Sequence, residues 1–215
     1  MTPEREEKFR RVASQRQLNL TVILENVHDP HNIGAVMRTC DAIGVAEIYV
    51  LYTDEQLTEE TLAIGTRAAA GAKKWVDVHL FTAVEDCFAA VKQKYDFVFS
   101  THLAEDAKSL YELDLSQSVA LLFGNERDGV SEESLAYSDG NFIIPQMGMV
   151  QSLNISVACA VTLYESLRQR KLKGYYEGAG PFAEADQEML YEKYYALHEQ
   201  KVLDKKQSKQ GLDLT

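Results

Sequence analysis

Short apolar runs alternate with predicted helices along most of this chain. The runs are rich in β-branched and aromatic residues and cover residues 20–24, 47–51, 75–78, 97–101, 119–123 and 141–144. Helices are expected between and around them, at residues 4–16, 32–42, 60–71, 82–94, 131–135 and 154–169. Strands that alternate with helices in this way are typical of an α/β domain with a mostly parallel sheet flanked by helices.

Three segments carry polar residues that a plain hydrophobic core would not use. They cover residues 26–38, 121–131 and 143–156, and each combines a short apolar run with a turn containing glycine. In this order they resemble the three motifs of the SpoU/TrmH family of RNA ribose 2′-O-methyltransferases, which belong to the knotted SPOUT superfamily. The resemblance extends over roughly residues 20–176, which is most of the chain.

The resemblance, and not the composition, implies a C-terminal deep trefoil knot, because ordinary topology rules exclude threaded chains. It also implies a homodimer and S-adenosyl-L-methionine as the cosubstrate that donates the methyl group. The residues implied to bind this donor are Thr101, Gly124, Ile144, Met147 and Leu153. Apart from the resemblance, Ile144 and Leu153 are ordinary core residues at the ends of a strand and a helix.

Arg38 is the residue that the resemblance makes essential for catalysis. In this family the arginine is often drawn as the base that deprotonates the 2′-hydroxyl. A guanidinium has a pKa above ~12 and only donates hydrogen bonds. We therefore expect Arg38 to hold a substrate phosphate and to stabilise the developing alkoxide. For a helical arginine, a surface salt bridge is the ordinary alternative.

Four further residues are assigned to the catalytic site by the same resemblance: Asn32, Glu126, Ser152 and Asn154. Asn32 is expected to position Arg38 or the ribose, and Glu126 to orient Arg38 or the backbone of the donor site. Ser152 and Asn154 are expected to form hydrogen bonds toward the donor or an opposing subunit. The alternatives are helix caps for the asparagines and the serine, and a solvated loop acid for Glu126.

The net charge of −11 argues at first sight against an RNA-binding protein, because a chain this acidic repels phosphate on average. Local clusters of basic residues, near the N-terminus and after the third motif, nevertheless give parts of the chain a positive charge. The RNA-contacting residues that we expect are Arg10, Arg11, Arg168, Arg170 and Lys171. By charge alone these clusters would be solvated faces, and only the motifs favour phosphate contact.

Length and composition suit one domain with extensions, since 46 % of the 215 residues are apolar. We divide the chain into a basic helical extension (1–19), a SPOUT methyltransferase domain (20–172) and a C-terminal extension (173–215). In the C-terminal extension a helix is expected over residues 184–200 and disorder from residue 205.

No membrane segment is expected. The three separated cysteines suit reduced thiols in a cytoplasm.

No metal site is expected, because the displacement needs none. His28 and His31 lack further ligands at metal-binding spacing.

The resemblance implies an enzyme that methylates a ribose 2′-hydroxyl in tRNA, with guanosine 18 of the D-loop as the first choice. Residues 68–75, 101–103 and 163–170 resemble that branch of the family. The tail after about residue 180 resembles it less, so another tRNA position or ribosomal RNA is the alternative target. A non-catalytic RNA-binding module is the remaining alternative, and the intact polar motif residues argue against it.

Overall fold

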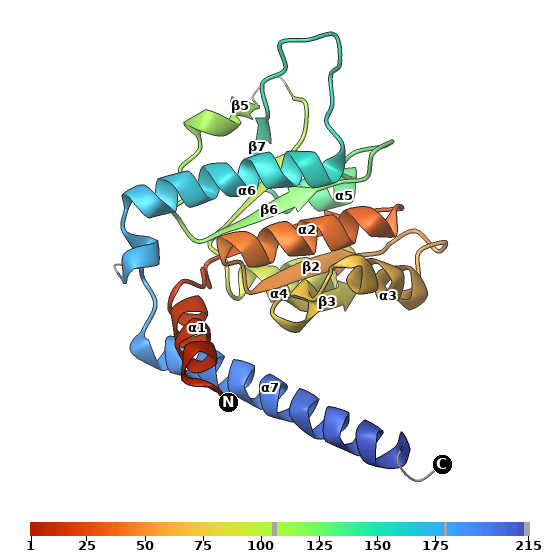
Figure 1. Ribbon diagram of the computed structural model, residues 1–215. Helices are drawn as coiled ribbons and strands as arrows, with labels where there is room; N and C mark the ends of the chain where they lie inside the picture. The colour runs from red at the N-terminus through yellow and green to blue at the C-terminus, as the bar shows by residue number, and fades with distance from the viewer. Residues whose placement is uncertain (105–106, 179, 213–215) are drawn as a thin grey trace.

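One sheet of seven parallel strands organises the molecule (Figure 1). The computed structural model describes residues 1–104, 107–178 and 180–212, and in the last helix the side chains through Lys201 together with that of Leu203. The strand order is β3-β2-β1-β6-β4-β7-β5, which confirms the expected α/β class. The strands are β1 (Leu20–Glu25), β2 (Glu47–Leu51), β3 (Asp77–Phe81), β4 (Phe97–Thr101), β5 (Lys108–Ser109), β6 (Val119–Phe123) and β7 (Gly140–Ile143).

The strands β1 and β6 lie side by side near the middle of the sheet and are buried along their whole length. Their sequences are nearly continuous apolar runs, because parallel strands covered on both faces have no solvent side. The register pairs Leu20 with Val119 and Leu24 with Phe123, so the two strands end at the same level. The loops that follow them, which hold the first and second motifs, therefore leave the sheet next to each other.

Helices cover both faces of the sheet (Figure 1). On one face α2 (Pro30–Ile43) and α6 (Ile155–Leu172) share a core with Val22 and Leu24 of β1. On the other face α4 (Val84–Lys92) and α5 (Glu132–Leu135) pack near Ile23. Successive side chains of β1 point to opposite faces of the sheet, and a layer of helices buries them on each face.

The helix α3 (Glu59–Ala68) packs directly on α2 through two glycines. A Cβ added to Gly34 would lie 2.8 Å from the carbonyl oxygen of Gly65, and one added to Gly65 would lie 2.6 Å from that of Pro30. These distances are too short for any side chain. Glycine at both positions therefore sets the close approach of α3 to the helix that carries the first motif.

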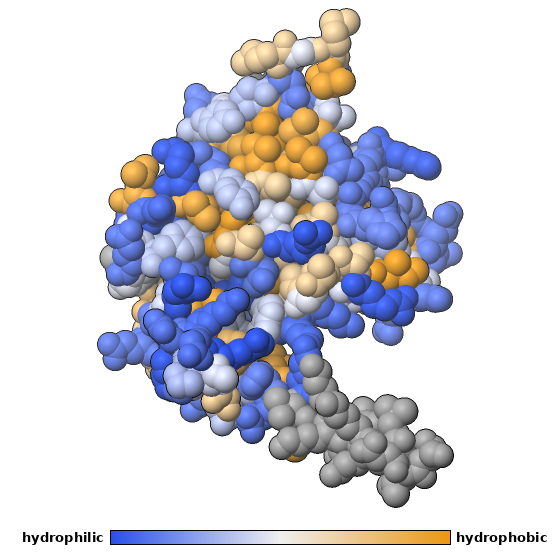
Figure 2. All heavy atoms as spheres, viewed as in Figure 1, coloured by the Kyte–Doolittle hydropathy of each residue, from blue (hydrophilic) through white to orange (hydrophobic). Residues whose placement is uncertain are grey.

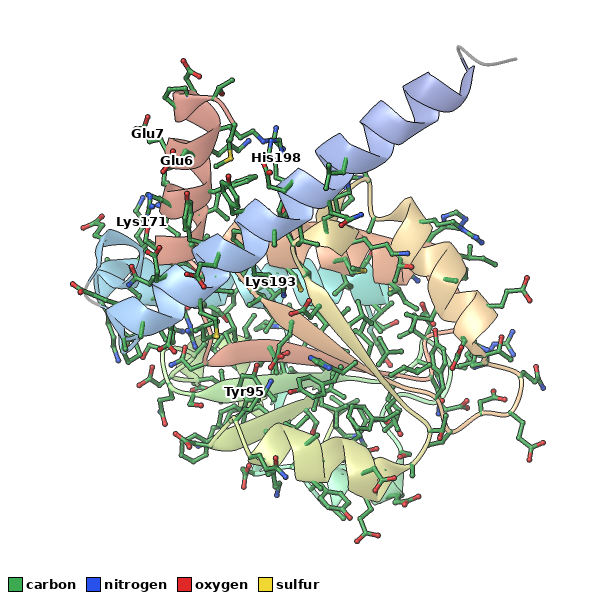
Figure 3. All side chains as sticks on the ribbon, turned by 90° about the horizontal axis from the view of Figure 1, so that it is seen from below. Glu6, Glu7, Tyr95, Lys171, Lys193 and His198 are labelled. Atoms are coloured by element: carbon green, nitrogen blue, oxygen red, sulfur yellow. The ribbon has the colours of Figure 1, made fainter. Side chains whose placement is uncertain are left out.

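The terminal helices α1 (Pro3–Ser14) and α7 (Glu184–Leu212) pack against each other outside the sheet (Figures 1 and 3). They share a small core to which α1 contributes Phe9 and α7 contributes Tyr194. Trp75, just after the 3-10 turn η1 (Ala72–Lys74), joins this core, with ring centroids 5.6 Å from Phe9 and 5.3 Å from Tyr194. The segments expected as two separate extensions therefore meet in one unit, which we call the terminal helix pair.

Some boundaries differ from those expected. The helix α2 begins at Pro30 and not at Asn32, because the carboxylate of Asp29 accepts a hydrogen bond from the backbone N–H of His31 at 2.9 Å and caps the helix. The helix α3 ends at Ala68, since Ala70 and Gly71 adopt positive φ angles of 49° and 97°.

The third strand is shifted, to Asp77–Phe81 in place of residues 75–78, because η1 occupies the preceding residues. The helix α7 continues to Leu212, so helix replaces the disorder expected from residue 205. For residues 213–215 that expectation lies outside the described residues. Two more 3-10 turns, η2 (Leu110–Glu112) and η3 (Tyr175–Glu177), complete the fold.

Candidate active site

Three loops meet at the edge of the sheet where β1, β6 and β7 end. They are the loop from β1 into α2, the loop over residues 124–131, and the irregular segment over residues 144–154. The carboxyl ends of parallel strands share one edge, which is where α/β sheets place their ligand sites. The three sequence motifs thus converge, and we call their meeting point the motif site.

Asn32 connects the three motifs. Its Nδ2 donates a hydrogen bond to Oε1 of Glu126 at 2.6 Å, and its Oδ1 accepts one from Nδ2 of Asn154 at 3.2 Å. Only 8 % of Asn32 is exposed, so both amide ends are used inside the protein. Asn32 therefore holds Glu126 and Asn154 at the first turn of α2, although they lie 94 and 122 positions further along the sequence.

The residue that caps α6 is Asn154, since its Oδ1 accepts from the backbone N–H of Ser156 at 2.9 Å. Asn154 therefore has both expected roles, as a helix cap and as a member of the polar site. Ser152 is exposed and does not cap this helix.

The loop over residues 124–131 is shaped by its own backbone and by a buried carboxylate. A Cβ on Gly124 would lie 2.0 Å from the backbone of Gly129, and Gly129 itself has a φ of 71°. Asn125 closes the turn, because its Oδ1 accepts from the N–H groups of Arg127 and Asp128 at 2.8 and 2.7 Å. Glycine is required at both ends of this turn.

Glu25, at the end of β1, holds the far side of the same loop. Its carboxylate accepts from the backbone N–H and the Oγ of Ser131 at 3.1 and 2.6 Å, and from the Oγ of Ser134 at 2.8 Å. Sequence reasoning missed this residue. Its signal was a lone acid closing an apolar strand, since a carboxylate that is 1 % exposed needs such donors. Ser131 caps α5.

The segment over residues 144–154 forms neither helix nor strand, so its backbone N–H and C=O groups are not used in regular structure. Ile144 and Leu153 are half-buried at its two ends, while Met147 is 95 % exposed. Thr101 lies at the end of β4 and donates to the carbonyl of Leu122 at 3.3 Å. Ile144 and Leu153 thus place apolar side chains at the two ends of an irregular segment, and an adenine ring needs apolar surface of this kind.

Arg38 lies on the solvent side of α2 and is exposed. Within the described part of the chain it forms no side-chain hydrogen bond or ion pair, so the salt bridge considered as an alternative is absent there. Among the described residues neither Asn32 nor Glu126 forms a hydrogen bond or an ion pair with Arg38, and the two bond to each other. The motif site of a single chain thus holds Asn32, Glu126 and Asn154 together and leaves Arg38 apart.

The expectation that Arg170 contacts RNA is wrong. Its side chain is fully buried and donates to the carbonyls of Leu115 and Gln117 at 2.9 and 2.7 Å and to the carbonyl of Asn19 at 3.2 Å. Burial lowers the pKa of this guanidinium to about 10. Arg170 therefore connects the end of α6 to the loops that precede β1 and β6.

The other expected RNA contacts remain on the surface. Arg11, Arg168 and Lys171 are exposed, although Arg168 also pairs with Glu165 at 2.7 Å. Arg10 is exposed too, and its guanidinium lies 3.8 Å from the centroid of the Tyr191 ring.

The fold and the motif site define a class: parallel α/β proteins whose polar site is assembled from loops at the carboxyl ends of neighbouring strands. The sequence model of the SpoU rRNA Methylase family matches residues 19–164, which is more than half of the chain. The protein belongs to this family, and the expected membership is confirmed. No group of three or more His, Cys, Asp or Glu side chains placed to hold a metal ion occurs among the described residues.

Curated relatives with similar sequences are named as tRNA-modifying enzymes. The tRNA (guanosine(18)-2′-O)-methyltransferase of Thermus thermophilus is 43 % identical over 178 residues, covering 82 % of this chain and 88 % of that protein. Its namesake from Escherichia coli is 40 % identical over 176 residues, covering 82 % and 75 %. A 23S rRNA (guanosine-2′-O-)-methyltransferase of Xanthomonas axonopodis is 37 % identical over 152 residues, covering 70 % and 59 %.

Solved structures agree with these relationships. The Aquifex aeolicus TrmH/SpoU tRNA modifying enzyme superposes with a TM-score of 0.76 at 31 % identity, covering 92 % of this chain and 96 % of that one. The SpoU methyltransferase AviRb of Streptomyces viridochromogenes, solved in complex with AdoMet, gives a TM-score of 0.64 at 25 % identity, covering 73 % and 59 %.

Proposed function

We propose that this protein transfers a methyl group from S-adenosyl-L-methionine to the ribose 2′-hydroxyl of guanosine 18 in tRNA. The observation that carries this proposal is the junction at Asn32, which ties together the three motifs of a SpoU methyltransferase. The names of relatives at 40–43 % identity support the guanosine of tRNA as the target.

The chain must hold the donor and align the hydroxyl behind its methyl group, and alignment alone can lower a barrier by several kcal/mol. S-adenosyl-L-methionine supplies the methyl group when bound. Ile144 and Leu153 flank the apolar part of the proposed donor site, and the turn at Gly124 offers backbone at close range. Asn32, with Glu126 and Asn154, fixes the distance between these loops.

Arg38 acts as an electrostatic group in this mechanism. Its pKa above ~12 makes it a poor base, but its planar fork of donors suits a phosphate oxygen and a developing alkoxide. An exposed guanidinium without a partner in the described chain is free to take that role. The 2′-hydroxyl proton would then leave to solvent or substrate oxygen as the charge on the alkoxide is stabilised.

A homodimer would bring Arg38 to a donor site. Val157, Val161, Tyr164 and Arg168 form a stripe at helical spacing on the outer side of α6, and Val157 and Tyr164 are 46 % and 53 % exposed. Figure 2 shows an apolar patch over the first half of this helix. The helix α2, which carries the exposed Arg38, shares the core of this layer with α6. We propose that two copies pair through this layer and that Arg38 serves the partner's site.

The deep trefoil knot belongs to this proposal as well. Its support is the likeness to the Aquifex aeolicus TrmH/SpoU structure over 92 % of the chain.

We also propose the cytoplasm as the compartment of this protein. The three cysteines are free and buried. None of the helices in the described part of the chain has both the length and the apolar character needed to cross a bilayer.

The proposed RNA contacts are Arg11 on α1, with Arg10 beside it, and Arg168 and Lys171 at the end of α6. Their side chains are exposed.

The proposed methyl transfer is tested by incubating the protein with labelled donor and unmodified tRNA transcripts and mapping the methylated ribose. We expect a single product at guanosine 18. Methylation elsewhere would replace the target, and binding of tRNA without methyl transfer would make the protein a non-catalytic module.

Two inactive variants test the sharing of the site. Arg38→Ala and Asn154→Ala remove groups that would belong to opposite subunits of one site. When the two variants are mixed, part of the activity should return, because mixed dimers contain one intact site. No recovery, with mixed dimers demonstrated by mass, would show that Arg38 serves its own chain.

A further inference from the structure

A small hollow lies in the terminal helix pair, away from the motif site. It is bounded by α1, by the turn into η1 and by α7, and its volume is about 270 Å³. Cationic side chains reach it from all three elements: Arg5, Lys74 and Lys201. Trp75 and His198 supply aromatic walls, and Figure 3 shows His198 on the side of α7 that faces α1.

The cations of this hollow have no acid to neutralise them within the part of the chain that the structure describes. No carboxylate there pairs with Arg5, Lys74 or Lys201. The pKa of Lys201 is lowered, chiefly by its contact with the ammonium group of Lys74 and further by Arg5. Like charges held together in this way repel one another and attract an anion.

The acid that lines the hollow is already paired. Asp41 accepts from Nη2 of the buried Arg16 at 2.6 Å. Neighbouring cations differ from the three in the hollow, since Lys193 pairs with Asp77 and Arg10 pairs with Glu188. The positive charge of the hollow is thus available to a ligand, whereas Lys193 and Arg10 are used within the protein.

The walls of the hollow are firmly built. Trp75 packs on Phe9 and Tyr194, and His198 lies edge-on to Phe9 with a centroid distance of 5.8 Å. Ala70, a non-glycine residue with a φ of 49°, turns the chain so that η1 enters the hollow. A backbone held in this sparsely populated conformation is over-determined by its surroundings.

The size of the hollow limits its ligand. Pockets for cofactors and drug-sized molecules usually span roughly 300–1,000 Å³, so a hollow of 270 Å³ suits a single small group. Three cations and two aromatic rings suit a phosphate with an adjoining sugar or base. A chain with a net charge of −11 can attract RNA only through such local positive sites.

We infer that this hollow binds one backbone phosphate of the RNA substrate and so holds the RNA at a point distant from the methylated ribose. The inference rests on the proposed function and adds a contact that includes residues outside 19–164, the part that the family model matches. It also gives α7 a role, because Lys201 and His198 come from that helix.

The test is tRNA affinity as a function of salt for Lys74→Gln, Lys201→Gln and the double variant. The control matched to each single variant is Lys92→Gln on α4, which removes one charge from the opposite face of the sheet. We expect the double variant to bind tRNA about 10-fold more weakly and to lose roughly 0.9 from the slope of log K against log salt, the value for one phosphate. The control should match the wild type, and all variants should keep their melting temperature.

Methyl transfer is measured in parallel, because the two proposals can fail separately. At saturating tRNA the double variant should keep the wild-type kcat, with only the KM for tRNA raised. If the wild type methylates tRNA and the double variant binds it with unchanged affinity and slope, the inference about the hollow is overturned alone. If the wild type neither binds nor methylates tRNA, the proposed function fails with it.

Inorganic phosphate distinguishes a nucleic-acid contact from a site for a free anion. Trp75 is the single tryptophan of the chain and lines the hollow, so its fluorescence reports occupancy. We expect tRNA to change this fluorescence at much lower concentration than phosphate, and Lys74→Gln to weaken the tRNA response. A response to phosphate alone, with tRNA affinity unaffected by the variants, would assign the hollow to a small anion and contradict the inference.

Discussion

The motif site and the terminal helix pair use polar side chains in opposite ways. At the motif site the polar groups are bonded to one another, as Asn32 is to Glu126 and Asn154. In the hollow of the terminal helix pair Lys74 and Lys201 lie next to each other, and no carboxylate among the described side chains pairs with either. Internal bonding fixes geometry, which a displacement reaction needs, whereas uncommitted charge provides attraction that tolerates a moving partner. Arg38 combines the two features, since it is catalytic in our proposal and yet has no hydrogen-bond or ion-pair partner within the described residues.

The largest effect is expected at Arg38. Arg38→Ala should lower kcat by roughly 10³-fold, because a charged donor to the developing alkoxide is lost, while the melting temperature and donor affinity stay near wild type. Single-turnover methylation measures the rate, and calorimetry measures the donor affinity. Arg38→Lys separates the two roles: if it kept most of kcat and moved the pH profile downward, Arg38 would be a base and not an electrostatic group.

Two arginines on α6 test whether burial or exposure decides a role. Arg170→Met should lower the free energy of unfolding by about 3 kcal/mol, because the acceptors on Leu115, Gln117 and Asn19 lose their donor in a buried place. Arg168→Met should cost less than about 1 kcal/mol, as exposed pairs do. Urea unfolding measures both. Equal losses of stability would contradict the assignment of Arg170 to the scaffold.

A third polar cluster, around Glu47, sharpens the comparison because it has a dense network but no motif residue. Burial alone would raise the pKa of the Glu47 carboxyl, but hydrogen bonds from His79, Lys94 and Tyr95 hold it at about 2. Its contribution to stability is therefore complete above the usual carboxyl pKa near 4.5 and is lost as the pH falls toward 2. Glu47→Gln should cost about 2 kcal/mol at pH 7, and the difference from wild type should shrink below pH 4.5.

Methyl transfer checks the meaning of that cluster. Below its melting temperature, Glu47→Gln should retain the wild-type kcat. A loss of kcat without a loss of stability would show that polar networks outside the motif site also take part in the reaction.

The smallest effect distinguishes paired from unpaired surface cations. Arg11→Gln should weaken tRNA binding by roughly 3-fold, as loss of one exposed phosphate contact does. Arg10→Gln should change it by less than about 2-fold, since that guanidinium already pairs with Glu188 and Glu6. Filter binding at low salt gives both values, and a larger effect for Arg10 would reverse the ranking.

Most strands of the fold were predictable, because runs rich in β-branched and aromatic residues mark the strands of a sheet, and the bounds of residues 97–101 and 119–123 are as expected. The two-residue strand β5 was missed because it is too short to show such a run, and β3 was placed two residues too early. The position of Asn32 in its helix was misjudged, since Asp29 and Pro30 are the stronger start signal. The burial of Arg170 had a readable sign: it continues the spacing of Cys159, Leu163 and Ser166, whereas Arg168 does not. Charge counts overlooked that periodicity.

The contacts that build the motif site could not be read from local sequence. The bonds from Glu25 to Ser131 and from Asn32 to Glu126 span 106 and 94 positions, and they follow from the placement of β1 beside β6. The hollow of the terminal helix pair combines Arg5 with Lys201 for the same reason, because only the packing of α1 on α7 brings them together.

One measurement tests the central claim directly: methyl transfer to two tRNA transcripts that differ only by a 2′-deoxyribose at guanosine 18. The account predicts one methyl group per molecule on the all-ribose tRNA and none on the deoxy tRNA, although both bind with similar affinity. Equal methylation of the two would contradict the account, because the accepting atom would then lie elsewhere.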